Sequence, residues 1–233
     1  MNRRRGLLAA LGWSAALCSP PVRSQAPAPR VGELKSLGQE RFQIGRIVVD
    51  KRASSFTVPG RVHALGKPLE YLATSPGGMK AYETLLELDA IGSEFNLACI
   101  LVGLERDAKQ PPWREFRQVP RLVGQRVALS IAWSEAGKRR QVAAAEALLN
   151  PEAGVKPESV EWVYIGSPAS EGAGRFAADD TGTLIGFIHD ANCIIESGAT
   201  IGIGAYGSVR GSAMLPPVGS AIELVVDAAN PTK

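Results

Sequence analysis

The sequence is poor in the residues on which many catalytic and metal sites depend. Only two of its 233 residues are histidine and only three are cysteine. It contains no Cys-x-x-Cys, no His-Glu-x-x-His and no Gly-x-Ser-x-Gly pattern. These absences argue against thioredoxin-like, zinc-protease and serine-hydrolase sites, and the cysteines are too few for an iron–sulfur cluster. We therefore expect no cofactor.

The apolar run at the N-terminus is too short to cross a bilayer. It covers Gly6 to Cys18, 13 residues, and follows three consecutive arginines, which is typical of a secretory signal peptide. We predict a signal peptide over residues 1–26, with an open cleavage position and an uncleaved anchor as the alternative. "RRGLL" also resembles a twin-arginine signal, so the export route stays open. The expected location is the bacterial periplasm or the exterior, with no membrane span after signal removal.

The domain that follows lacks a net positive charge. Residues 1–26 hold four arginines and no acid, so their removal changes the formal net charge from +3 to −1. A chain with this balance has no overall positive field to attract nucleic acid or anionic lipid. We expect its partner to be an envelope protein or a small ligand, and not nucleic acid.

The remaining pattern indicates one domain in which strands outnumber helices. We predict a linker at 27–41, a single domain at 42–228 and a frayed tail at 229–233. The segment "SEFNLACILVGLE" has apolar residues at helical spacing, which predicts a buried helix over about 93–104 with Ser93 as its N-cap. "AAAEALLN" predicts a short second helix over about 143–149, ended by Pro151. The fold class is α+β with a mainly antiparallel sheet.

The stretch "TSPGGMKAYETLLELD" (Thr74 to Asp89) places two glycines between two extended segments. A two-residue Gly-Gly turn is typical of a tight antiparallel hairpin. The register that follows makes Glu70 a diagonal neighbour of Glu83 and Glu87, and carboxylates so close can raise one another's pKa. Glu83 and Glu70 are therefore the candidate catalytic residues, for a general acid or a cation site. A solvated sheet face is the alternative interpretation. Tyr82, Lys80 and His63 are the candidate ligand-binding residues.

Three short patterns suggest chemistry that their context does not support. "GIGAYG" (Gly202 to Gly207) matches a dinucleotide fingerprint, but no βαβ unit surrounds it. "DTG" (Asp180 to Gly182) lacks the second copy that an aspartic protease needs, so we expect a hairpin turn there.

The segment "HDANC" offers His189 and Cys193 as weak candidates for a transition-metal site. Cys99 lies in an apolar segment, where a small buried side chain is the plain interpretation. A disulfide between Cys99 and Cys193 is the alternative that export permits.

Most of the chain also resembles a known family. "VDKRASSFTVPGRVHALGKPLEYLATSPGGMKAYETLLELD", the helix "FNLACILVGLE", "EWVYIGS" and "GRFAADDTGTLIGFIHDANCII" together resemble the YdjY domain of exported bacterial proteins. Glu70 and Glu83 fall on motif positions of that family, whereas Tyr82 stands where the family often has histidine. The resemblance implies a fold and export, and it implies no activity.

These observations favour an exported envelope protein that acts as a non-enzymatic binding or partner-interaction module. The alternative is a hydrolytic or metal-assisted enzyme that uses the Glu70/Glu83 carboxylate pair. The two hypotheses differ in whether Glu70 and Glu83 line a pocket or lie on an open face.

Overall fold

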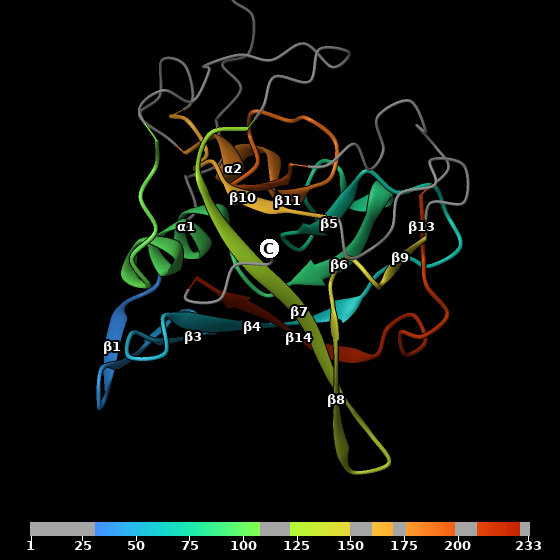
Figure 1. Cartoon of the computed structure of the whole chain (residues 1–233), viewed down its shortest axis with the longest axis horizontal. Coiled ribbons are helices and arrows are strands. Elements are labelled where there is room, and N and C mark those ends of the chain that lie inside the picture. The colour runs from blue at the N-terminus through green and yellow to red at the C-terminus, as the bar shows by residue number, and fades with distance from the viewer. Residues whose placement is uncertain (1–30, 108–121, 150–159, 170–175, 199–208, 229–233) are drawn as a thin grey trace, which may run out of the picture.

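The structure is a computed structural model that describes residues 31–107, 122–149, 160–169, 176–198 and 209–228 (Figure 1). The predicted signal peptide, the predicted C-terminal tail and the Gly202–Gly207 pattern lie outside the described residues. The strands are β1 Leu34–Gly38, β2 Arg41–Ile44, β3 Ile47–Asp50, β4 Ser55–Val62, β5 Tyr71–Thr74, β6 Thr84–Leu88, β7 Gln125–Glu135, β8 Lys138–Ala143, β9 Leu148–Leu149, β10 Trp162–Tyr164, β11 Thr183–Gly186, β12 Ile195–Ser197, β13 Arg210–Gly211 and β14 Ala221–Asp227. The helices are α1 Gly92–Leu101, α2 Ala177–Thr181 and the 3₁₀ turn η1 Ala81–Glu83.

Eight strands form a closed barrel. Their order is β4, β14, β7, β10, β12, β11, β5 and β6, and β6 pairs with β4 to complete the circuit. Inward-facing residues on these strands, such as Val58, Leu86, Ile131 and Leu224, are completely buried. The prediction of a β-rich fold with helices is confirmed, but the expected mainly antiparallel sheet is instead a barrel of mixed strand direction. The parallel pairs are β5–β6 and β11–β12.

Strand β4 exchanges partners halfway along one edge, at Pro59 and Gly60. Residues 55–57 pair with β3, and residues 60–62 pair with β6. Proline has no N–H to donate, so it suits the point at which one neighbour leaves and the next begins. Through β3, the strands β1 and β2 extend the sheet beyond the barrel. Strand β1 lies inside the segment that we expected to be a linker, so ordered structure begins before Phe42.

The predicted antiparallel hairpin at Gly77 and Gly78 is wrong. After β5 the chain turns at residues 75–78 and forms η1, which returns it to the start of β5. Strand β6 then runs parallel to β5, with Tyr71 opposite Thr84 and Ala73 opposite Leu86. The turn residues were read correctly as a chain reversal, but the second reversal in η1 carries no strong sequence signal.

Helix α1 confirms the predicted helix, three residues shorter at its C-terminal end. It packs Phe95 edge-on against Phe56 of β4, with ring centroids 5.3 Å apart, and it leaves Ile100 exposed. The N-cap position is Ile91 and not Ser93. The backbone N–H of Ser93 donates instead to the Asp179 carboxylate at 2.7 Å. Asp179 belongs to α2, a short helix that falls where the sequence predicted only a turn.

The predicted second helix at 143–149 is absent, because the segment continues the sheet. The N–H of Ala144 donates to Leu129 of β7, and the carbonyl of Ala147 accepts from Ser212. Residues 144–147 form a turn, and Leu148 and Leu149 then pair with β13. Alanine has the highest intrinsic helix propensity, but such propensity is a weak preference that tertiary contacts override. Bonding to neighbouring strands and burial of Ala144 and Ala147 outweigh that preference.

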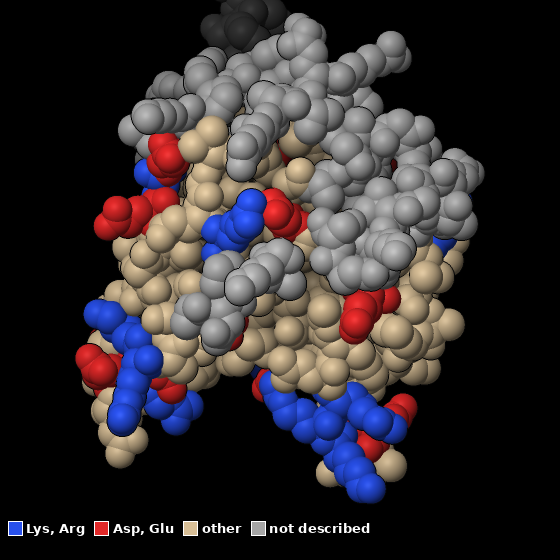
Figure 2. Space-filling view, viewed as in Figure 1, with Lys and Arg blue, Asp and Glu red and all other residues tan. Residues whose placement is uncertain are grey.

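A two-stranded arm of β7 and β8 projects from the barrel (Figure 1). Lysine and arginine side chains gather on this arm (Figure 2). Arg139 pairs with Glu223 at 2.6 Å and Arg140 with Glu135 at 2.9 Å. These exposed pairs compensate the charge of the arm but contribute little stability.

Neither of the two described cysteines forms a disulfide, and both are buried. Cys99 lies in α1 with no exposed surface, which confirms its interpretation as a small core side chain. The alternative of a Cys99–Cys193 disulfide is absent from the structure. Within the described ranges, no helix combines the length and the apolar character that crossing a membrane requires.

Candidate functional site

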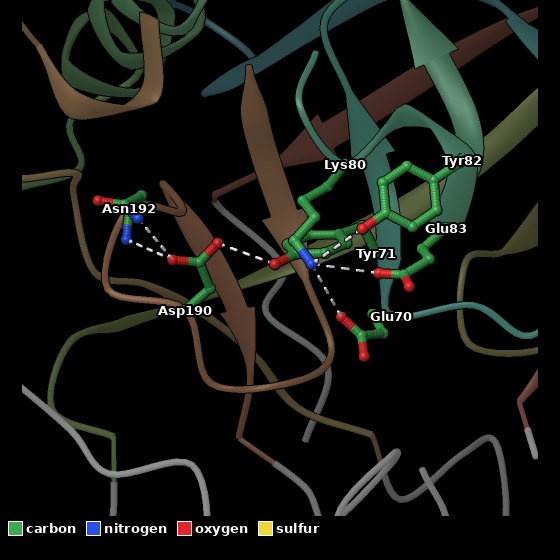
Figure 3. Close-up of polar contacts among 7 residues, drawn as sticks. All are labelled: Glu70, Tyr71, Lys80, Tyr82, Glu83, Asp190 and Asn192. Atoms are coloured by element: carbon green, nitrogen blue, oxygen red, sulfur yellow. Dashed lines mark hydrogen bonds and ion pairs between the residues drawn. The ribbon is translucent and has the colours of Figure 1, made fainter. Parts of the chain in front are cut away.

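Four of the predicted site residues meet where the chain turns between β5 and β6. Glu70 directly precedes β5, Lys80 directly precedes η1, and Tyr82 and Glu83 belong to η1 (Figure 3). The Lys80 ammonium lies 3.4 Å from a Glu83 oxygen, 3.9 Å from a Glu70 oxygen and 3.4 Å from the Tyr82 hydroxyl. The two carboxylates that the sequence suggested are thus brought to one shared ammonium.

The loop that carries Lys80 is fixed against the end of α2. Gly182 has a φ of +72°, and a Cβ on it would lie 2.6 Å from the Cα of Gly78. At this contact Ser75 N–H donates to Gly182 and Met79 N–H donates to Thr181, each at 2.8 Å. Two glycines are needed because the two backbones touch directly. Gly78 therefore serves close packing, whereas Gly77, with a φ of +67° and no atom within 4 Å of a Cβ, serves the turn before Lys80.

A second group of polar residues reaches the same place from the segment after β11. The Tyr71 hydroxyl donates to a carboxylate oxygen of Asp190 at 2.9 Å (Figure 3). The other oxygen of Asp190 accepts from the backbone and side-chain nitrogens of Asn192, each at 2.9 Å. The sequence analysis did not select Tyr71, Asp190 or Asn192. Asp190 and Asn192 stand in the "HDANC" segment, but their partner Tyr71 is 119 residues away.

Beneath these residues lies a buried histidine–carboxylate pair. Nδ1 of His189 is 3.1 Å from Oε2 of Glu196, whose other oxygen accepts from the Asp190 backbone at 3.1 Å. The two side chains are 2% and 0% exposed. The contact between Nδ1 and the carboxyl group fixes the orientation of the ring. Nε2 of His189 is buried and has no partner among the described residues.

Some of these groups line an open pocket of about 530 Å³, and Tyr82, Glu83 and Glu196 are not among its lining residues. Its lining residues are Glu70, Tyr71, Lys80, Ile188, His189, Asp190 and Asn192. We call it the Lys80 pocket. Its volume falls within the range of small-molecule sites, about 300–1,000 Å³. Its polar groups come from three separate segments of the chain, and the hydrogen bonds among them hold each in a defined direction.

Two side chains of the Lys80 pocket have altered proton affinity. Burial lowers the pKa of Lys80, but the bond to Tyr82 and the carboxylates of Glu83 and Glu70 outweigh it, so the net shift is upward. Burial, followed by electrostatic interactions with Cys193 and Asp190, raises the pKa of Tyr71 far above its usual value. Lys80 therefore stays a cation and Tyr71 stays a neutral hydroxyl donor at physiological pH.

His63 lies in a different cluster and does not line the Lys80 pocket. Its Nδ1 is 3.6 Å from a carboxylate oxygen of Glu87, and the other oxygen of Glu87 is bound closely by Arg61. Arg61 and Glu87 are direct neighbours across β4 and β6. The expected neighbourhood of Glu87 with Glu70 is therefore wrong, because it depended on the antiparallel register.

The positions of possible metal ligands do not support the predicted transition-metal site at His189 and Cys193. Across the parts of the chain that the structure describes, no three His, Cys, Asp or Glu side chains lie close enough to hold a metal ion. His189 is engaged by Glu196, and the Cys193 sulfur lies tightly against Gly186. A metal at His189 and Cys193 stays a prediction.

Comparison with known proteins assigns the family. The family model of the YdjY domain matches residues 47–227, which is most of the chain and all of the barrel. The chain belongs to the YdjY domain family. The match begins at β3 and ends at the last residue of β14, so it covers all three segments that line the Lys80 pocket of this YdjY domain. Searches of curated proteins and of solved structures found no match.

Proposed function

We propose that this YdjY-domain protein is an exported envelope protein that binds a small polar ligand in the Lys80 pocket without transforming it. The observation that supports the proposal most is a concave site of about 530 Å³ whose polar groups converge from distant parts of the chain. A few oriented polar groups in a preformed cavity are what small-ligand sites share.

The state of the charged groups favours binding over catalysis. A paired-carboxylate mechanism needs two acids that face the substrate and push their pKa values apart. Here the Lys80 ammonium engages both Glu70 and Glu83. Tyr71 and Asn192 engage Asp190 in the same way. Such mutual pairing holds the groups in place for recognition and does not leave an acid directed at a reacting bond.

The test is a thermal-shift screen of a chemically broad small-molecule library against residues 27–233. A ligand at a hundred times its Kd stabilises a protein by about 2.7 kcal/mol, which is a readily measured shift. We expect the shift to disappear in Asp190→Ala, which removes the acceptor of Tyr71 and Asn192. It should persist in Arg139→Met, a control on the projecting arm. Hits that ignore the Asp190 substitution would overturn the assignment of the pocket.

The competing function is a hydrolytic or metal-assisted enzyme, favoured by the presence of Glu70 and Glu83 on one ammonium. A broad hydrolase-substrate screen of the wild type and of Glu83→Gln separates the two. Turnover that the wild type shows and Glu83→Gln loses would replace the binding proposal with the enzymatic one.

Export is tested independently of the ligand. Fractionation of a bacterium that expresses the tagged full chain should place a shortened protein outside the cytoplasm. A full-length product that stays with the inner membrane would instead support the uncleaved-anchor alternative.

A further inference from the structure

Strand β1 lies at the outer edge of the sheet and exposes apolar side chains (Figure 1). Among the described strands it pairs with β2 alone, and none of its five residues is buried. Val31, Leu34 and Leu37 are 46%, 46% and 49% exposed, and they are three of the nine large apolar side chains exposed within the described residues. An edge strand with exposed apolar side chains is a template for pairing with another strand.

One face of β1 continues the hydrophobic core. Leu34 lies directly opposite Ile44 of β2, and Ile44 lies opposite Ile47 of β3. Both isoleucines are completely buried, so Leu34 is the last member of an apolar row and the only one that the sheet edge leaves uncovered. Covering it with a second apolar side chain would remove further apolar surface from water, which is favourable.

The other face of β1 carries two charges of opposite sign. Glu33 and Lys35 line a small pocket of about 130 Å³ together with Gln43, so their side chains lie on the same face. Both side chains are exposed, and neither has an ion pair within the described residues. One acid and one base on either side of Leu34 make the strand complementary to a reversed copy of itself.

Two-fold symmetry restricts how two such strands can pair. Opposite residues of an antiparallel pair share a face, so a two-fold axis must set one residue opposite its own copy. An axis at Leu34 sets that leucine against the partner's Leu34, and Glu33 against the partner's Lys35. The same register sets Val31 against the partner's Leu37. An axis at Glu33 or at Lys35 would instead place like charges directly opposite each other, which is destabilising.

Strand β8 also has an unpaired edge but lacks this complementarity. Among the described strands it pairs with β7 alone. It begins with three consecutive cations, Lys138, Arg139 and Arg140, all of them exposed. Antiparallel pairing of two such segments would bring like charges together, and charged edges of this kind prevent association. Of these two edges, β1 is therefore the one suited to a second copy.

We propose that two copies of this chain associate by antiparallel pairing of their β1 strands about a two-fold axis at Leu34, so that their sheets become continuous. Stable interfaces bury about 1,200–2,000 Å² in total, and pairing over residues 31–37 alone is smaller, so the dimer is weak and depends on concentration. Strands β1 and β2 lie outside the range that matches the YdjY family model. The contact is therefore independent of the family assignment, and it is also independent of the ligand proposed for the Lys80 pocket.

The experiment is sedimentation equilibrium of residues 27–233 at concentrations up to about 1 mM, at which weak contacts are populated. We expect the wild type to pass from monomer to dimer. Glu33→Lys and Lys35→Glu should each weaken self-association at least about tenfold, because two attractive pairs across the strands become repulsive. An equimolar mixture of the two variants should recover association, because both pairs then join opposite charges again.

Matched controls and a local measurement identify the interface. Lys138→Glu and Glu105→Lys make the same charge reversals on exposed side chains outside β1 and should leave association unchanged. Thermal unfolding of each variant shows that it is folded. Hydrogen exchange should slow in β1 as the concentration rises and stay constant in β8, because only β1 gains backbone partners.

Three results would each overturn the proposal. The first is a monomer at every concentration, which would leave the β1 edge to a strand from another protein. The second is a dimer that both charge reversals leave intact, since its interface would then lie elsewhere. The third is a mixture of the two variants that fails to recover association, since the register centred on Leu34 requires that recovery.

Discussion

Closure of the barrel depends on a glycine at the contact of β4 with β6, and Gly60→Ala tests this. Gly60 lies opposite Leu88 in the antiparallel pair. A Cβ at this position would collide with the carbonyl oxygen of Glu87 and lie 2.9 Å from a Leu88 methyl carbon. The Leu88 side chain can rotate, but the Glu87 carbonyl belongs to the strand backbone. The two strands must therefore separate for alanine to fit.

The size of the effect follows from two opposing terms. Overpacking in a well-packed interior costs about 1–3 kcal/mol, and a backbone obstacle places this case near the upper end. Alanine also restricts the unfolded chain, which returns about 0.4–1 kcal/mol. The expected net loss is about 2 kcal/mol of unfolding free energy. For a domain of this size that loss lowers Tm by about 4–8 °C.

Gly66→Ala is the matched control. Its Cβ would meet no atom within 4 Å, and its backbone does not have a positive φ. Alanine restricts the unfolded chain equally in both variants. The difference between their unfolding free energies therefore isolates the collision with β6. We would compare urea and thermal unfolding of the two variants by circular dichroism. Equal stability of Gly60→Ala and Gly66→Ala would refute closure of the barrel at this point.

Two further predictions concern parts of the fold that hold the site and the N-terminal strands. Burial raises the pKa of Tyr71 and Tyr164 in the folded protein above the ordinary value of 10.0. The stability that this shift contributes is complete below pH 10.0, the pKa of the unfolded chain, and is lost as the pH rises from there to the higher pKa of the folded protein. Unfolding free energy should therefore fall above about pH 10, with a shallower slope in Tyr164→Phe, and an unchanged slope in urea titrations would contradict this. Glu94 accepts from the backbone of Gly32 at 2.9 Å and packs against Gly45, so Glu94→Ala should release β1 and β2. Hydrogen exchange should then quicken in β1 while β14 stays protected, and uniform protection would show that Glu94 does not hold them.

Local sequence was sufficient where the decisive interactions are local. Helix α1 could be predicted because its buried residues recur at helical spacing within ten positions. Glu70, Lys80, Tyr82 and Glu83 were selected together, and they do meet, because they lie within 14 residues on either side of one chain reversal. Their proximity does not depend on the predicted hairpin, which was wrong, and their role as site residues stays a prediction.

Strand partners and the other half of the Lys80 pocket were decided only in three dimensions. Alternation of apolar residues shows that a strand is half-buried, but it does not show which strand lies beside it or in which direction. The parallel course of β6 moved Glu87 to Arg61 and His63, and pairing of β5 with β11 carried Asp190 to Tyr71. Sequence alone thus determined which segments are buried and which side chains are available for a site. The closing of the barrel decided which of them meet, because the pairing of distant strands depends on the whole set of strands at once.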